Sequence, residues 1–170
     1  MQSLANRLAI QHFVNAYTQE TGKGYLLHKN QQTSTQQAFS QGLTLLILPI
    51  HSIQAQCYFP LSYVSRVGRH RVANLPQIII QGQSKTFSPV AIVGLLLEEL
   101  VSASSIPLDA ASLVEKWIQS RDALQQFLVQ REHEFDDLIK AGQSFIETEQ
   151  ALILGHSMHP APKSRTGFVY

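Results

Sequence analysis

The last sixteen residues, 155–170, hold the groups that could do chemistry together. They comprise two histidines, two cationic side chains and several hydroxyls: His156, His159, Lys163, Arg165, Ser157, Ser164 and Thr166. Pro160 and Pro162 preclude a regular helix, because proline lacks an amide donor and restricts the residue before it. The sequence therefore predicts an extended, stiffened loop that displays cations and hydroxyl donors.

This set of groups suits the phosphates of a nucleotide. Arg165 could bind phosphate oxygens with two donors, and Lys163 could act as a compact point charge. The remaining donors would be hydroxyls, imidazoles and one open backbone amide: Ser157, Ser164, Thr166, His156, His159 and Gly167. A basic, proline-containing tail in solvent is the alternative that composition leaves open.

A zinc site at the same residues is disfavoured. His156 and His159 are three positions apart, which would place them on one face of a helix, but Pro160 argues against a helix. No third ligand lies nearby in the sequence, whereas zinc usually takes at least three protein ligands. We assign no metal ligand.

A second basic cluster surrounds Gly68, and it has two interpretations. Arg66, Arg69, His70 and Arg71 could make another anion contact, but a solvated hairpin turn is the favoured explanation.

Other reactive side chains carry little information. Cys57 is best explained as a small buried apolar group, because a nucleophilic cysteine needs a nearby base. Glu147 and Glu149 could bind magnesium or orient a histidine, although charges on a helix surface explain them better. We assign no role to four histidines: His12, His28, His51 and His133.

The end of the chain resembles a known signature. Residues 149–152 read Glu-Gln-Ala-Leu, and residues 155–168 read Gly-His-Ser-Met-His-Pro-Ala-Pro-Lys-Ser-Arg-Thr-Gly-Phe. This order resembles the NRPS-independent siderophore synthetases, the aerobactin synthetase-like (IucA/IucC) family, whose pattern is Glu-Gln-Ala and then Gly-His-Pro-x-His-Pro-x-x-Lys-x-Arg-x-Gly. Ser157 stands where the family usually has proline, which should loosen the loop slightly without removing a charged group.

The resemblance implies an ATP-dependent ligase. Such enzymes bind ATP with magnesium, adenylate a carboxylate of citrate or a related acid, and let an amine or alcohol attack it. By resemblance the ATP-phosphate region would contain His156, Ser157, His159, Lys163, Ser164 and Arg165, with Gly155 and Gly167 as backbone-permissive positions. The catalytic residues are not identified by the resemblance.

The resemblance also bears on domain organisation. Family members are several times longer than this chain, so we expect residues 1–154 to form their amino-terminal, thumb-like α+β domain. Residues 155–170 would begin the nucleotide-binding motif, with the rest of the enzyme absent and no catalysis by this chain alone. The competing hypothesis is a stand-alone, non-enzymatic module that binds an anion or a partner. Self-association is a further hypothesis, because a partial enzyme would expose apolar surface.

The first half of the chain contains the strand signals. Residues 43–50 form an apolar run, residues 53–59 alternate in polarity, and residues 63–67 and 77–81 are further candidates. Together they predict a small antiparallel sheet. Residues 30–41 are rich in Gln, Thr and Ser and are predicted to be a polar loop or strand edge.

Helices are predicted on both sides of these strands. Apolar residues recur at helical spacing from Leu4 to Tyr17, and Ser88-Pro89 is typical of a helix start. Asp109 should cap a long helix through Leu128, and another helix is predicted over residues 135–152. The fold class is therefore α+β, with a small antiparallel sheet packed against several helices.

Composition restricts the class of protein. The formal net charge of +1 argues against nucleic acid or a membrane surface as partner, and the resemblance implies small-molecule substrates, a carboxylic acid and an amine or alcohol. Cys57 is the only cysteine, so no disulfide forms within the chain. The first residues lack a signal-peptide pattern and the apolar runs are too short to span a bilayer, which predicts a cytoplasmic protein.

Overall fold

The computed structural model describes residues 2–105 and 107–130, and the fold class is α+β, as predicted. Six strands in this part of the chain form one antiparallel sheet: β1 (Tyr25–Leu27), β2 (Thr44–Ile50), β3 (Ala55–Tyr63), β4 (Arg71–Val72), β5 (Gln77–Ile80) and β6 (Gln83–Lys85). The strand order is β1-β2-β3-β5-β6, and β4 pairs with the far end of β3 along the edge that also carries β5.

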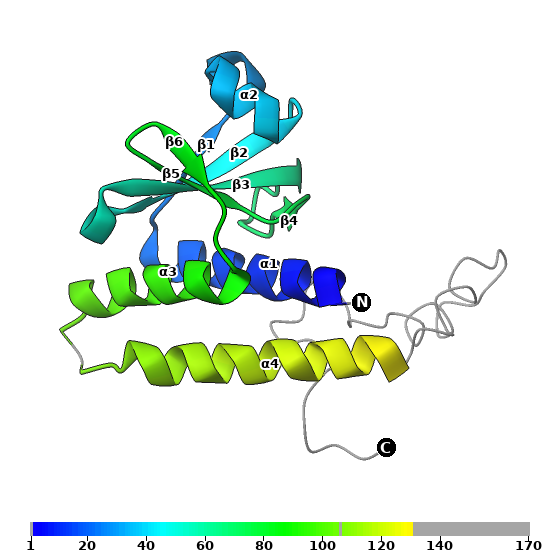
Figure 1. Ribbon diagram of the computed structural model, residues 1–170, viewed down its shortest axis with the longest axis vertical. Coiled ribbons are helices and arrows are strands. Elements are labelled where there is room, and N and C mark those ends of the chain that lie inside the picture. Colours follow the sequence, from blue (N-terminus) through cyan, green and yellow to red (C-terminus); the bar gives the residue numbers. More distant parts are fainter. Residues whose placement is uncertain (1, 106, 131–170) are drawn as a thin grey trace, which may run out of the picture.

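The helices of the described residues form two layers beneath the sheet. They are α1 (Gln2–Thr21), α3 (Pro89–Ala103) and α4 (Ala110–Gln130), while the short α2 (Ser34–Ser40) lies beyond the sheet's other face. Figure 1 shows α1 and α3 side by side against the sheet, with α4 on their far side. The main core lies between the sheet and the first helical layer, where Ile10 and Val14 of α1 meet Phe59 and Ile78.

Helix α1 serves two contacts because apolar residues occupy two of its faces. Val14 and Tyr17 pack toward the sheet. On another face of the helix, Ala5 and Ala9 form a second apolar cluster with Leu124 and Leu128 of α4. Small alanine side chains let the two helices approach closely. The helix ends at Thr21, and Gly22 follows it with a φ of +63°, a left-handed backbone conformation that favours glycine.

The predicted helix starts are confirmed. Ser88 Oγ accepts a hydrogen bond from the amide of Ala91 at 3.2 Å, and Pro89 occupies the first turn of α3. Asp109 accepts from the amides of Ala111 and Ser112 at 3.1 and 3.3 Å at the start of α4. The helix predicted over residues 135–152 lies outside the described residues.

Strand β2 is buried on both faces, which explains its continuous apolar run. Leu46 and Leu48 join the main core, whereas Leu45 and Ile47 join a second cluster with Tyr58. Phe39 of α2 covers that cluster, with its ring 5.7 Å from the ring of Tyr58 in an edge-on arrangement. The sheet therefore has apolar contacts on both sides, and α2 supplies the second.

Two predictions about local structure were wrong. Residues 30–41 contain α2, which begins with a capping box in which the Thr33 hydroxyl accepts from Gln36 N and Gln36 Oε1 accepts from Thr33 N. Residues 63–67 are not a strand beyond Tyr63, because the chain turns there and pairs again only at β4. The short edge strands β1 and β6 were not predicted.

Cys57 is buried, as predicted. It lies opposite Leu48 on β2 and Ile78 on β5, within the main core. Burial strongly raises the pKa of its thiol, outweighing a hydrogen bond to the backbone of Tyr58 that lowers it. The thiol therefore stays protonated and serves packing, since only a thiolate is a good nucleophile.

Candidate functional site

The residues predicted to bind a nucleotide lie outside the described part of the chain. They are His156, Ser157, His159, Lys163, Ser164, Arg165 and Gly167. The residues considered with them, Glu147, Glu149 and His133, also lie outside it. The phosphate-binding interpretation of the motif stays a prediction, and the geometry available is that of the domain that precedes it.

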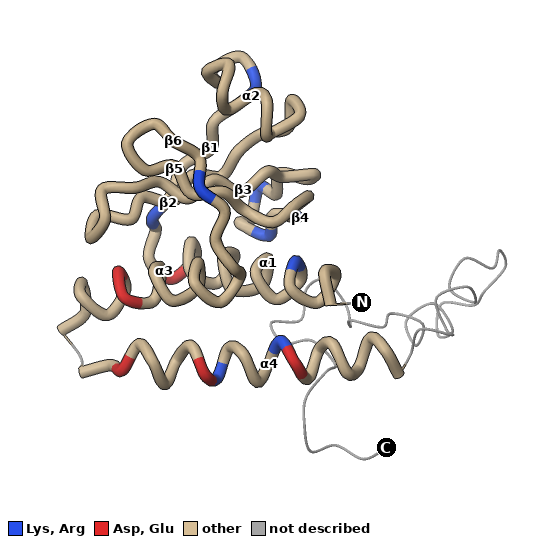
Figure 2. The backbone as a smooth tube through the Cα atoms, viewed as in Figure 1, with Lys and Arg blue, Asp and Glu red and all other residues tan. Residues whose placement is uncertain are grey.

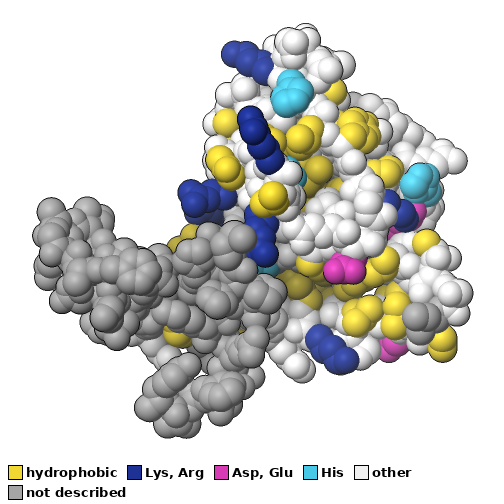
Figure 3. All heavy atoms as spheres, turned by 180° about the vertical axis from the view of Figure 1, so that it is seen from behind, with side chains coloured by type: hydrophobic (Ala, Val, Ile, Leu, Met, Phe, Trp, Pro, Cys, Tyr) yellow, Lys and Arg dark blue, Asp and Glu magenta, His cyan; other side chains and the backbone are white. Residues whose placement is uncertain are grey.

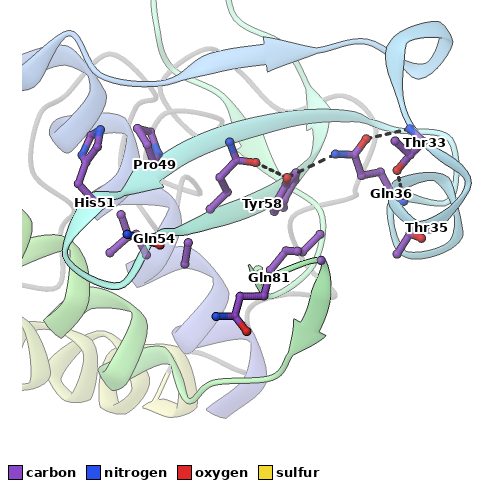
Figure 4. A pocket seen from close by; sticks show the side chains of 13 residues that line it. Thr33, Thr35, Gln36, Pro49, His51, Gln54, Tyr58 and Gln81 are labelled. Carbon is purple, nitrogen blue, oxygen red and sulfur yellow. Dashed lines mark hydrogen bonds between the residues drawn. The ribbon is translucent and has the colours of Figure 1, made fainter.

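That domain has a groove of about 770 Å³ on the sheet face that carries α2. Three segments line it: the start of α2 with Thr33, the β2–β3 connection with Gln54, and the β5–β6 turn with Gln81. Figure 4 shows these side chains around Tyr58. No Asp, Glu, Lys or Arg lines the groove, whose surface is made of amides, hydroxyls and apolar side chains together with the imidazole of His51.

A chain of hydrogen bonds crosses this face. Gln36 Nε2 donates to the Tyr58 hydroxyl at 3.4 Å, the Tyr58 hydroxyl donates to Gln56 Oε1, and Gln56 Nε2 donates to the Tyr25 hydroxyl at 3.3 Å. Burial raises the pKa of Tyr58, the hydrogen bond from Gln36 partly opposes this, and the net direction is upward. Tyr58 is therefore a neutral donor near pH 7, and the groove lacks the fixed positive charge that a polyphosphate requires.

Beside the groove, Glu99 of α3 holds the β2–β3 connection. Its Oε1 lies 2.6 Å from His51 Nδ1 and 3.9 Å from Lys23 Nζ, and its Oε2 accepts from the amides of His51 and Ser52 at 3.1 and 3.3 Å. Burial alone would raise the pKa of Glu99. The hydrogen bonds from His51 and Ser52 and the charges of His51 and Lys23 outweigh burial and hold that pKa below its usual range.

The Glu99 cluster has a structural role. Its carboxylate satisfies two amides at the start of the 3₁₀ turn His51–Ile53, which would otherwise lack partners. No sequence pattern predicts this contact, because Glu99 and His51 are 48 positions apart. Within residues 2–105 and 107–130, no group of three or more His, Cys, Asp and Glu side chains could hold a metal ion.

The basic cluster around Gly68 lies on a loop that α1 holds in place. We call residues 62–72, which comprise the end of β3, the turn after it and β4, the arginine loop. Four side chains of α1, spaced four positions apart, bond to the backbone of this loop and of the residue after it. Arg7 donates to Ala73 O, Gln11 accepts from Val72 N, Asn15 bonds to both backbone groups of His70, and Gln19 donates to Val67 O.

The arginine loop is also fixed from within. The imidazole of His70 is 8% exposed, and its Nδ1 accepts from the amide of Ser65 at 3.2 Å. Burial lowers the pKa of His70, which keeps the ring neutral and able to accept. His70 is thus a structural residue, and the three arginines are attached to a positioned backbone. Residues 64–70 connect the antiparallel strands β3 and β4, with Arg66 exposed at the turn, so the favoured interpretation as a solvated hairpin turn is confirmed, and α1 holds the backbone of that turn.

Charge is divided between the two halves of the described structure. None of residues 21–97, which include the whole sheet, α2 and the first part of α3, is Asp or Glu. The acidic residues of the described part are Glu20, Glu98, Glu99, Asp109, Glu115 and Asp122. Figure 2 shows red segments on or beside the helices, and Figure 3 shows dark blue side chains of Lys and Arg over the sheet-bearing half. The sheet half is thus the electropositive half.

Comparison with known proteins gives relatives in both sequence and structure. No protein-family model matches the chain. Spermidine-citrate ligase of Bacillus anthracis is 27% identical over 176 aligned positions, which cover 99% of this chain and 29% of that protein. N(2)-citryl-N(6)-acetyl-N(6)-hydroxylysine synthase of Escherichia coli is 27% identical over 123 positions, which cover 72% of this chain and 21% of that protein.

Two of the solved structures that resemble the chain are structures of the same protein. The ATP-bound aerobactin synthetase IucA from a hypervirulent pathotype of Klebsiella pneumoniae matches with a TM-score of 0.70 and 25% identity. The match covers 95% of this chain and 27% of that one. The chain spans less than a third of the length of each of these relatives. No helix among the described residues is long and apolar enough to cross a membrane.

Proposed function

Because this chain is a relative of the NRPS-independent siderophore synthetases, we propose that it forms part of an ATP-dependent ligase of siderophore biosynthesis. The reaction would condense a carboxylic acid such as citrate with an amine or alcohol. The observation that carries the proposal is that 99% of the chain aligns with a spermidine-citrate ligase, at 27% identity. Its structural likeness to an ATP-bound synthetase supports the same proposal. ATP is a cytoplasmic substrate, so the proposed reaction belongs in that compartment.

The donor set of residues 155–170 fits a polyphosphate. Lys163 and Arg165 would neutralise the phosphates and stabilise the charge that develops as pyrophosphate leaves. His156, His159 and the hydroxyls of Ser157 and Ser164 would orient the phosphates, with the open amide of Gly167 approaching closely; these are the proposed ATP contacts. Magnesium would accompany ATP, and none of the described residues is assigned to it.

We further propose a division of labour along the chain. The α+β domain, residues 1–154, would position the motif that begins at residue 155, and residues outside this chain would complete the nucleotide site. This follows from the share of the relatives that the chain covers, which is 29% or less. The isolated chain is therefore expected to give no measurable exchange of pyrophosphate into ATP.

Pyrophosphate exchange tests the assignment in a protein of the relatives' length that contains this sequence. The variant Lys163→Ala/Arg165→Ala is expected to lose exchange by about a hundredfold or more, because two charge-assisted contacts of the transition state disappear. A matched control, Lys29→Gln/Lys85→Gln, removes the same net charge from the sheet half and should keep its rate. Equal rates for the motif variant and the parent would refute the assignment, and catalysis by the isolated chain would refute the division of labour.

A further inference from the structure

The arginine loop presents cations that have few partners of their own. Arg66 and Arg71 are exposed, and neither side chain has an ion pair or a side-chain hydrogen bond with another residue of the described part. Arg69 adds a third positive charge within six residues. No Asp or Glu lies between Glu20 and Glu98 in the sequence, and none of the ion pairs among the described residues involves Arg66 or Arg71.

Arg71 is held in an orientation suited to binding. Its guanidinium carbon lies 5.8 Å from the centre of the Tyr63 ring, and the Tyr63 side chain is itself 56% exposed. A cation–π contact of this kind restrains the guanidinium without using its hydrogen-bond donors, so those donors stay available. Those donors match the paired oxygens of a carboxylate or phosphate.

The backbone beneath these side chains is already ordered. Asn15 and Gln19 of α1 bond to the backbone at His70 and Val67, and His70 bonds to Ser65 N. A ligand that binds a positioned loop does not have to pay the entropy of ordering it, so modest contacts give measurable affinity. The sequence alone could not show that α1 holds the backbone of this exposed turn in place.

We propose that the arginine loop is a binding site for small oxyanions that carry two or more negative charges, either as carboxylates or as phosphates. The three arginines lie within one short loop, whereas a nucleic acid would need a basic face that follows its backbone. The site is separate from residues 155–170 and goes beyond the function proposed above.

Titration calorimetry of the full chain at low ionic strength tests the proposal, with inorganic pyrophosphate and citrate as separate probes. The parent is expected to bind at least one probe, and the better probe identifies the preferred oxyanion. Arg66→Gln/Arg71→Gln should weaken binding by about tenfold or more, because two charge-assisted hydrogen-bonding groups are lost. Both side chains are exposed, so folding should persist, and the thermal melting curve checks this.

Two controls make the result decisive. Lys29→Gln/Lys85→Gln removes the same charge from the same half of the domain and should bind like the parent, which separates a site from a general field. Lys163→Gln/Arg165→Gln removes the cations of the motif, so any pyrophosphate bound by residues 155–170 is lost from it, and the binding that remains should disappear once Arg66→Gln/Arg71→Gln is added. The proposal is wrong if the parent binds neither probe, if the arginine-loop variant binds like the parent, or if only the motif variant loses binding. That last result would leave the proposed function intact.

Discussion

Asn15 of α1 and His70 at the end of the arginine loop exchange two hydrogen bonds across 55 positions of sequence. Asn15 Nδ2 donates to His70 O at 3.0 Å, and His70 N donates to Asn15 Oδ1 at 3.1 Å. One side-chain amide therefore satisfies both backbone groups of a residue that has no strand neighbour. The contact links the helix layer directly to the loop that carries the arginines.

Replacing Asn15 with alanine should destabilise the domain by about 2 kcal/mol, because two hydrogen bonds are lost and a partly buried backbone pair is left unsatisfied. Urea unfolding measures the change. Gln19→Ala is the control, since Gln19 makes one exposed hydrogen bond to Val67 O in the same row and should cost about 0.5 kcal/mol. Equal losses for the two variants would contradict the central place given to Asn15.

His70 predicts a dependence of stability on pH. Burial lowers its pKa in the folded protein, so the unfolded chain binds a proton more readily once the pH falls below about 6.5. The contribution of the neutral His70 ring to the free energy of unfolding is fully present above about pH 6.5 and declines as the pH falls below that value toward 5. Urea midpoints measured over this range should decrease for the parent.

A His70→Asn variant isolates this effect, because asparagine can still accept a hydrogen bond from Ser65 N but does not titrate. It should be less stable at pH 7, since the buried ring is lost, yet its midpoint should depend less on pH than that of the parent. Parallel pH profiles for parent and variant would show that His70 is not the titrating group.

Two buried tyrosines predict opposite effects of removing a hydroxyl. Tyr17 is 4% exposed and its hydroxyl has no hydrogen-bond partner among the described residues, whereas the hydroxyl of Tyr58, which is 3% exposed, bonds to Gln36 and Gln56. Tyr17→Phe should leave stability unchanged or raise it by up to about 1 kcal/mol, because an unpaired polar group is removed. Tyr58→Phe should cost about 1 to 2 kcal/mol, and thermal unfolding ranks the pair. The reverse ranking would mean that the Tyr17 hydroxyl has a partner.

Two glycines should respond differently to alanine. Gly94 lies inside α3, and an added Cβ would meet only Val114 at 3.9 Å, an ordinary contact, so Gly94→Ala should stabilise the domain by about 1 kcal/mol. Gly24 has a φ of +107° and an added Cβ would lie 2.6 Å from Leu48 Cδ2, so Gly24→Ala should destabilise it by about 2 kcal/mol or more. Chemical denaturation measures both, and a loss of stability in Gly94→Ala would indicate that α3 and α4 pack more tightly than the structure shows.

The helix boundaries were predictable because their signals are local. Ser88-Pro89 and Asp109 act on amides two or three positions away, so the sequence contains the whole interaction. The same rule should have revealed α2, since Thr33 and Gln36 have the spacing of a capping box. The composition of residues 30–41 masked that signal.

The contacts that shape the described surface were not predictable in this way. Glu99 meets His51, and Asn15 meets His70, only after the sheet and helices have packed. Periodicity identified α1 by its apolar residues, and its polar row, with Asn15 and Gln19, resembled an ordinary solvated face. The motif of residues 155–170 was recognisable because its residue order is dense, although its geometry lies outside the described residues.

The burial of β2 on both of its faces affects how the register of the sheet is specified. Leu46 lies opposite Phe59 and Ile47 opposite Tyr58, so sliding β2 by one position would exchange one apolar set for another. Hydrophobicity within the strand hardly opposes such a slip. Contacts near the two ends of the strand must therefore fix its register. Gln54 turns the chain after β2 with a φ of +49°, and the side-chain Nε2 of Gln32 donates to Leu43 O, just before β2, at 2.7 Å. Two glutamines, Gln32 and Gln54, thus fix the register of β2, a strand whose own apolar residues hardly specify it.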